Sequence, residues 1–366
     1  MSFNGVTLRR IFPIVLGSAL VLGCNKSDSG CVPPSVVAVH PQRFEPVAEA
    51  ATGSAYASFI RFANAAINDL TPTVAYAASL QGSLTNVSLS SRPYALAIND
   101  DGVIYAPRLD AASAARFQLP STEPTGHVSV GSIPTDVSFD LTGCRAFVSN
   151  QGGSVSVIDV SSNTVAQTIT VPDRAFVSLV SPDNQRLYIG SAIGKVYVYD
   201  FGSSRLIDSI TVGDVPQHLT FHPDGVRLYV SMRDLGRVVE VDTRANSVVR
   251  AFSSTYGVQE AVVGPEGGEL YVANQSGWLE IWNLGTGGHI DDVPLGDGPW
   301  ALTLSPDKTR LYAGILFDGT VAVINRSSRA VERYIDVGGI PRRIKFAPDN
   351  RTMVVANESG YITFIP

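Results

Sequence analysis

A four-residue turn recurs seven times along this chain, and its spacing constrains the fold more than any other feature. The copies begin at residues 99, 140, 181, 222, 264, 305 and 347, so neighbouring copies lie 41 or 42 residues apart. Pro fixes φ, and a Gly or Asn at the end of the turn tolerates positive φ, so each copy predicts a tight turn. The seven turns are NDDG, DLTG, SPDN, HPDG, GPEG, SPDK and APDN.

Each repeat also carries four short strand signals. The first precedes the turn, as in "PQHLTF" (216–221), and the second follows it, as in "RLYV" (227–230). The third is an alternating run that ends in Asp or Asn, such as "KVYVYD" (195–200), and the fourth resembles "LIDSITV" (206–212). Alternation with a period of two indicates strands. Four strands in each repeat of this length are typical of a propeller blade.

The second strands support this interpretation through a family resemblance. The segments "LYVANQSG", "AFVSNQGG" and "MVVANESG" resemble the Tyr-Val-Thr-Asn core of YVTN-type β-propeller repeats, with a similar turn before and a similar alternating run after. The resemblance covers about residues 90–366. It implies a propeller fold. The family includes bacterial surface and periplasmic propellers, and the wider group includes lactonase-like proteins, so the resemblance implies no single activity.

The last repeat stops after its third strand, "YITFIP", and its fourth strand must come from elsewhere. The segment 84–89, "LTNVSL", lies in phase just before the first repeat. We therefore expect residues 83–366 to form an all-β, seven-bladed β-propeller of four-stranded antiparallel blades, closed by an N-terminal strand. An in-phase "TVAYA" at 73–77 leaves an eight-bladed ring as an alternative, and residues 54–82 are expected to hold further strands of uncertain role.

The N-terminus predicts export and a lipid anchor. Arg9 and Arg10 precede a short apolar run, the order of a secretory signal, over residues 1–23. The run ends in "VLGC", which resembles the bacterial lipobox and makes Cys24 the candidate lipidation site, although an ordinary signal peptide is the alternative. Lipidation would hold the chain on a membrane without a spanning helix. Asn25 favours the outer membrane, at its periplasmic face or at the cell surface.

Residues 24–53 are rich in Ser, Pro, Val and Ala without a regular period, and they predict a flexible tether. The sequence leaves open whether Cys31 and Cys144 pair. Metal-ligand spacings, phosphate loops, dinucleotide fingerprints and the Gly-x-Ser-x-Gly motif are absent from the sequence, so no metal and no cofactor are expected. The net charge of −6 disfavours nucleic-acid binding, which would need a contiguous basic patch from Arg342, Arg343 and Lys345.

The residues that follow the start of each first strand are the best candidates for a site. In a propeller the first strands surround the central channel, so equivalent positions of the seven repeats form rings at one channel mouth. A purely structural repeat would place the same small or apolar residue at each position. The candidates that depart from this rule are Asp136, His218, Glu260, Trp300, Arg342 and Arg343.

These residue types suggest two functions. His218, beside Glu260 on the next blade, could serve as a general base. The two arginines could hold an anion, and Trp300 could form a stacking wall. Channel mouths are also wet and tolerate varied polar residues. We therefore expect a binding or scaffold module for a protein partner or small ligand at the mouth, with a lactonase-like hydrolase as the alternative.

Overall fold

The computed structural model describes residues 26–27, 30–31 and 83–366. Lys26–Ser27 (β1) and Gly30–Cys31 (β2) form a two-stranded antiparallel pair within the expected tether. The expected signal peptide, the lipidation site at Cys24 and the strands expected within 54–82 lie outside the described residues. Within the described part of the chain no helix has the length and apolar character that crossing a bilayer requires.

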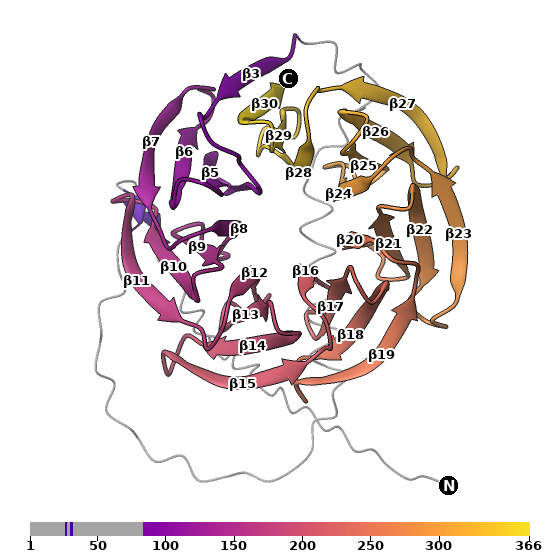
Figure 1. The fold of residues 1–366 in the computed structure, drawn as a ribbon, viewed down its shortest axis with the longest axis horizontal. Helices are drawn as coiled ribbons and strands as arrows, with labels where there is room; N and C mark the ends of the chain where they lie inside the picture. The colour runs from indigo at the N-terminus through magenta and orange to yellow at the C-terminus, as the bar shows by residue number, and fades with distance from the viewer. Residues whose placement is uncertain (1–25, 28–29, 32–82) are drawn as a thin grey trace, which may run out of the picture. The chain divides into compact units, whose positions relative to one another are not determined.

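Residues 83–366 form seven four-stranded antiparallel sheets, arranged as the blades of a β-propeller around a central axis (Figure 1). The first, innermost strands are β4 (Ala97–Ile98), β8 (Pro134–Phe139), β12 (Ala175–Val180), β16 (Pro216–Phe221), β20 (Val258–Val263), β24 (Pro299–Leu304) and β28 (Pro341–Phe346). The second strands are β5 (Val103–Arg108), β9 (Arg145–Asn150), β13 (Arg186–Ser191), β17 (Arg227–Met232), β21 (Glu269–Asn274), β25 (Arg310–Ile315) and β29 (Met353–Asn357).

The third strands are β6 (Ser113–Gln118), β10 (Ser154–Asp159), β14 (Lys195–Asp200), β18 (Arg237–Asp242), β22 (Trp278–Asn283), β26 (Thr320–Asn325) and β30 (Tyr361–Ile365). The outermost, fourth strands are β7 (Pro124–Ser129), β11 (Thr164–Thr170), β15 (Arg205–Thr211), β19 (Ser247–Ser253), β23 (His289–Pro294), β27 (Ala330–Asp336) and β3 (Thr85–Ser88). We number the blades 1 to 7 by their first strands, from β4 to β28. The expected seven blades are confirmed, and no eighth sheet occurs among residues 83–366.

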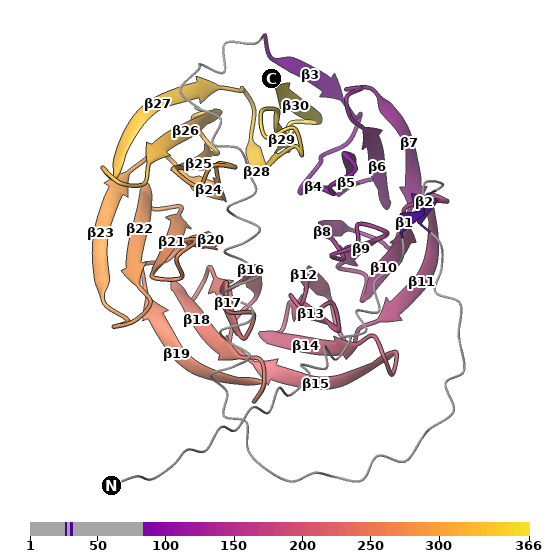
Figure 2. The ribbon, with the colours of Figure 1, turned by 180° about the vertical axis from the view of Figure 1, so that it is seen from behind.

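The ring closes as the sequence predicts. β3 pairs antiparallel with β30, from Thr85 opposite Phe364 to Ser88 opposite Tyr361, and completes blade 7. Figure 2 shows this junction from the other side of the ring, with β3 along the outer edge of blade 7. The pairing covers the outer edge of β30, a row of backbone groups that would otherwise be available to another chain.

The repeated turns adopt the expected backbone conformation. The last residue of every turn has positive φ, from Asn184 and Asn350 at 57° to Gly102 at 75°. Lys308 occupies this position at 62°, where the other six turns have Gly or Asn. A left-handed conformation costs a Lys more than it costs those residues.

Alternating side chains build the core between neighbouring blades. The ring of the second-strand Tyr188, for example, packs in one cluster with Leu219 and Val230 of the next blade. The carboxylates that end the third strands bond the turns that follow: Asp159 accepts from the Ser162 N–H at 2.9 Å, and Asp200 accepts from the Ser203 N–H at 2.7 Å. Cys144 is disulfide-bonded.

The antiparallel order gives the ring two faces. One face carries the starts of the first strands, the loops between second and third strands, and the connections between blades; we call it the mouth face. The opposite face carries the seven repeated turns; we call it the turn face. The first strands lie nearest the central axis (Figure 1), and we call the region between them the central channel.

Candidate functional site in the central channel

The first strands place two rings of side chains at the mouth-face end of the channel. In blades 2 to 7 the pairing of first and second strands skips a residue at this point, for example between Pro134 and Asp136. Such a bulge re-aims the side chains around it. The outer ring is Tyr94, Thr135, Phe176, Gln217, Gln259, Trp300 and Arg342. The inner ring is Ala95, Asp136, Val177, His218, Glu260, Ala301 and Arg343.

Four predicted residues of the inner ring meet in one ion-pair network. Arg343 of blade 7 contacts Asp136 of blade 2 through Nη2 at 3.1 Å and Glu260 of blade 5 through Nη1 at 3.0 Å. His218 of blade 4 adds a contact from Nε2 to the same Glu260 Oε1 at 3.1 Å. All four side chains are largely buried, between 4% and 14% exposed. The network therefore connects four blades across the channel axis.

The two carboxylates are also bonded to the backbone in the same way. Asp136 Oδ2 accepts from the Ser178 N–H of blade 3 at 3.2 Å, and Glu260 Oε2 accepts from the Leu302 N–H of blade 6 at 3.1 Å. In each case the acceptor bonds the first strand of the next blade. Each first strand is the inner edge of its sheet. The N–H groups that point away from the sheet, toward the channel, therefore need such partners.

Burial and pairing shift the pKa values of these groups in different directions. Burial would raise the pKa of Glu260, but Arg343 and His218 outweigh it and lower the pKa below its ordinary value. For Asp136 burial dominates over the attraction of Arg343, and the pKa is raised. Burial also lowers the pKa of His218, against the opposing effect of Glu260. The lowered pKa favours the neutral form of His218 in the folded protein.

Several polar atoms of the rings lack a hydrogen-bond partner among the described residues. They are His218 Nδ1, Arg342 Nη1 and both amide atoms of Gln259, and each is shielded from solvent. A buried polar atom without a partner costs free energy, so such atoms are uncommon in folded proteins. Their presence on blades 4, 5 and 7 indicates that this part of the channel has unused hydrogen-bonding capacity.

The outer ring places the other two predicted residues together. The guanidinium carbon of Arg342 lies 3.9 Å from the ring centroid of Trp300 and 5.0 Å from that of Tyr94, which is cation–π geometry. Arg342 also pairs with Glu358. The Tyr94 ring makes edge contacts with Trp300 and with Phe176, at centroid distances of 6.5 and 6.3 Å. The mouth thus has an aromatic wall with one arginine stacked on it.

Glu358 also lies at the channel mouth, although it is not among the site residues that the sequence predicts. It lies in the loop between β29 and β30, is 8% exposed, and also pairs with Arg92 at 3.2 Å. The signal was present, because the corresponding loop position after Asn is Gln151 or Gln275 in sibling repeats. The acidic substitution coincides with the only repeat that has Arg in the outer ring.

The basic residues considered for nucleic-acid binding do not form an open patch. The side chains of Arg342 and Arg343 are 15% and 11% exposed, and each is paired with a carboxylate. Lys345 lies deeper in the channel, two residues beyond Arg343 on the same strand. Among the residues that the structure describes, no group of three or more His, Cys, Asp or Glu side chains has metal-binding geometry.

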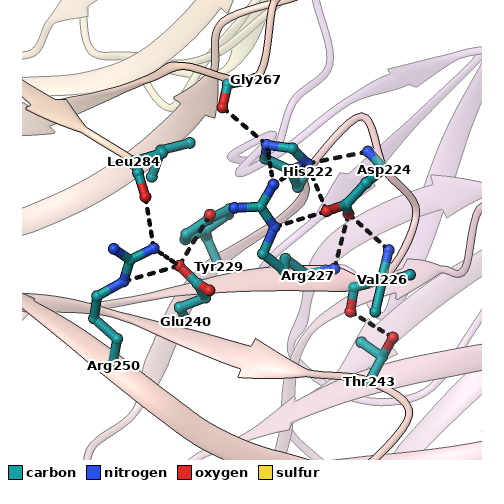
Figure 3. Close-up of polar contacts among 10 residues, drawn as sticks. All are labelled: His222, Asp224, Val226, Arg227, Tyr229, Glu240, Thr243, Arg250, Gly267 and Leu284. Carbon is teal, nitrogen blue, oxygen red and sulfur yellow. Dashed lines mark hydrogen bonds and ion pairs between the residues drawn. The ribbon is translucent and has the colours of Figure 1, made fainter. Parts of the chain in front are cut away.

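A second polar cluster lies on the turn face between blades 4 and 5 (Figure 3). His222, the first residue of the HPDG turn, is 7% exposed and has Nε2 3.0 Å from the carbonyl oxygen of Gly267 in the next turn. Its Nδ1 accepts from the Asp224 N–H at 3.0 Å, and Arg227 contacts both His222 and Asp224. His222 therefore connects two blades as well as stabilising its own turn.

Comparison with known proteins supports the fold. The fold is similar to that of hydrazine synthase from Kuenenia stuttgartiensis, with a TM-score of 0.69 and 20% sequence identity. The alignment covers 79% of this chain and 99% of that chain. No family model and no curated protein sequence matches this chain. At this level of identity the similarity concerns the propeller architecture.

Proposed function

We propose that this chain is a binding module that docks a protein partner on its mouth face. The observation that carries the proposal is the position of its exposed large hydrophobic side chains. Among the described residues twelve such side chains are exposed, and six of them lie on the mouth face, on or between blades 1 to 6, five in loops and one at the start of β22. They are Ile133, Ile193, Leu235, Tyr256, Trp278 and Phe317.

Their exposure is high for residues of this kind. Phe317 is 70% exposed, Tyr256 63% and Ile193 60%, and none of these three lies in a strand. Aromatic and aliphatic side chains presented by loops on a rigid scaffold are typical of protein-recognition surfaces. The loops surround the Trp300–Arg342 stack, so a partner covering them would also cover the channel mouth.

The state of the channel groups favours binding over hydrolysis. A His–Glu pair serving as general base needs a nitrogen free to take a proton from substrate or water. In His218 the Nε2 atom contacts Glu260, and the Nδ1 atom has no partner but is shielded from solvent. Both nitrogens of the Arg343 fork already contact carboxylates, so Arg343 could hold an anionic substrate only if these pairs separated, whereas a binding module uses the network as a rigid support.

The N-terminal features complete the proposal from sequence alone. The signal-like segment, the lipobox-like "VLGC" and the resemblance to YVTN-type propellers support an extracytoplasmic module held at the outer membrane through a lipid on Cys24. Metabolic labelling with an alkyne fatty acid tests the anchor. Label incorporated into the parent chain but absent from Cys24→Ala is expected, and equal labelling of both would contradict it.

Site-directed photo-crosslinking tests the docking face. A photoreactive amino acid is placed at Phe317 or Tyr256, and at Leu141 as a matched control, because Leu141 is 60% exposed but lies in a turn on the opposite face. After irradiation of living cells, a discrete crosslinked species is expected from the first two positions only. Equal products from Leu141, or none from Phe317 and Tyr256, would refute docking on the mouth face.

A further inference from the structure

The turn-face end of the channel contains a cavity of about 300 Å³. It is bordered by blades 6, 7 and 1, at the ends of their first strands and in the turns that follow. Its polar and charged lining includes Thr303, Lys308, Lys345, Asn350 and Asp100. This end of the channel is separate from the mouth face, so it has no part in the docking surface proposed above.

Lys345 differs in charge from the residues at the equivalent positions of the other blades. The equivalent first-strand positions of the other blades are Ala97, Ser138, Leu179, Thr220, Val262 and Thr303, and none of them is charged. Its ammonium group has no hydrogen bond or ion pair within the described part of the chain. Burial lowers its pKa, and the nearby Arg343 lowers it further against the attraction of Glu260. An unpaired ammonium group in such surroundings is unfavourable.

Lys308 is unusual because of its backbone conformation. It occupies the positive-φ position of its turn, at 62°, where Asn184 and Asn350 occupy the same position in other turns. Lys gains nothing from that backbone conformation, and its side chain makes no hydrogen bond or ion pair among the described residues. Backbone strain of this kind is often retained at functional sites.

Lysine is rare among residues 83–366, and it is concentrated at this cavity. The chain has three lysines within residues 83–366, and Lys308 and Lys345 both line this one cavity. The third, Lys195, begins β14 at the mouth face. Asp100 is the single acidic residue among the lining residues of the cavity, so the lining carries an excess of positive charge.

We propose that this cavity is a binding site for a small oxyanion, a phosphate or carboxylate group held between the ammonium groups of Lys345 and Lys308. An oxyanion would accept charge-assisted hydrogen bonds from both lysines, and the hydroxyl of Thr303 and the amide of Asn350 are available in the same lining. The cavity is bordered by three blades of the ring, which already stand in place around it. The site would therefore be preformed and would lose little conformational freedom on binding.

Calorimetric titration of the full-length chain with inorganic phosphate, and separately with acetate, tests the site. The expected result is one bound anion per chain for at least one of the two, and which one binds identifies the chemical class. Lys345→Met should weaken binding about tenfold or more, since it removes a charged donor. Lys195→Met is the matched control and should bind as the parent does.

Lys308→Asn separates binding from folding. Asn is the residue of two sibling turns, so this variant should keep or raise the melting temperature while weakening anion binding several-fold. Lys345→Met should also melt at a higher temperature than the parent in anion-free buffer, because it removes an unpaired cation. Absence of binding of both anions to the parent chain, or parent-like affinity in both Lys345→Met and Lys308→Asn, would overturn the proposal.

Discussion

Arg343 and Asp136 are separated by 207 residues in the chain, yet their side chains meet at 3.1 Å in the central channel. The contact joins blade 7, the last to be completed along the chain, to blade 2. The same guanidinium group reaches Glu260 of blade 5 at 3.0 Å. One side chain thus pairs with two buried carboxylates from different blades of the ring.

Arg343→Met should destabilise the protein strongly. The substitution leaves Asp136 and Glu260 buried without their cation, and breaking a buried pair by removing one partner costs about 3–5 kcal/mol. Urea denaturation followed by fluorescence measures the loss. Arg351→Met, at an exposed position of the same blade, is the control and should change the free energy of unfolding little.

A rescue variant distinguishes lost pairing from lost packing. Adding Asp136→Asn and Glu260→Gln to Arg343→Met removes both orphaned charges while keeping the shapes of the side chains. This triple variant should recover part of the lost stability. If it is no more stable than Arg343→Met alone, the unpaired buried carboxylates are not the cause of the lost stability.

The architecture could be predicted from sequence because each repeat encodes its own turn and strands locally. The constant spacing placed equivalent residues at equivalent heights in the channel, which is why Asp136, His218, Glu260 and Arg343 were expected to gather. Their pairing was not predictable, because it depends on how far a long side chain such as Arg343 reaches across the ring. The repeat pattern fixes the position of a Cβ atom but not the course of a flexible side chain.

The two tryptophans of β22 show a similar limit. Alternation places Trp278 and Trp282 on the same side of the strand, which predicts core packing for both, with a binding surface at the blade edge as the alternative. Trp282 is 9% exposed and packs with Phe252 at a centroid distance of 6.0 Å. Trp278 is 41% exposed because it is the first residue of the strand and lies at the edge of the blade. Periodicity predicts the face of a strand but not where along it burial ends.

Acidification should reveal the buried neutral state of His218. Its pKa is lowered in the folded protein, whereas an unfolded His titrates at about 6.5. Below that pH the unfolded chain binds a proton that the folded chain does not, so stability falls as the pH decreases, by up to about 1.4 kcal/mol per unit. The stability contributed by neutral His218 is complete above this range.

His218→Gln isolates the effect, because Gln can still donate to Glu260 but does not titrate. Urea midpoints measured from pH 7.5 to 5.5 should fall more steeply for the parent than for the variant. Parallel curves over this range would show that His218 takes up protons equally in the folded and unfolded states.

Ring closure by β3 should be sensitive to a single residue. Val87 is 8% exposed and packs with Ile362 and Phe364 of the strand that β3 covers. Val87→Asp would bury a charge there, at a cost on the order of 3 kcal/mol or more. Thr85→Asp, at an exposed position of the same strand, is the control.

The expected consequence of Val87→Asp is twofold. The melting temperature should fall, and the released edge of β30 should promote self-association that increases with concentration, measured by sedimentation velocity. A variant that sediments and melts like the Thr85→Asp control would indicate that the ring holds together without β3.

His222 links blades 4 and 5 on the turn face, so its replacement should weaken the ring. His222→Ser restores the residue found in two sibling turns, Ser181 and Ser305, but removes the contact with the Gly267 carbonyl and vacates a buried position (Figure 3). Leaving a buried acceptor without its partner costs about 1–3 kcal/mol, so the consensus-like change should destabilise the protein. Thermal unfolding measures the shift, with His127→Ser as the control because His127 is exposed. If both variants melt alike, the His222 bridge contributes nothing to the stability of the ring, and its turn is equivalent to the others.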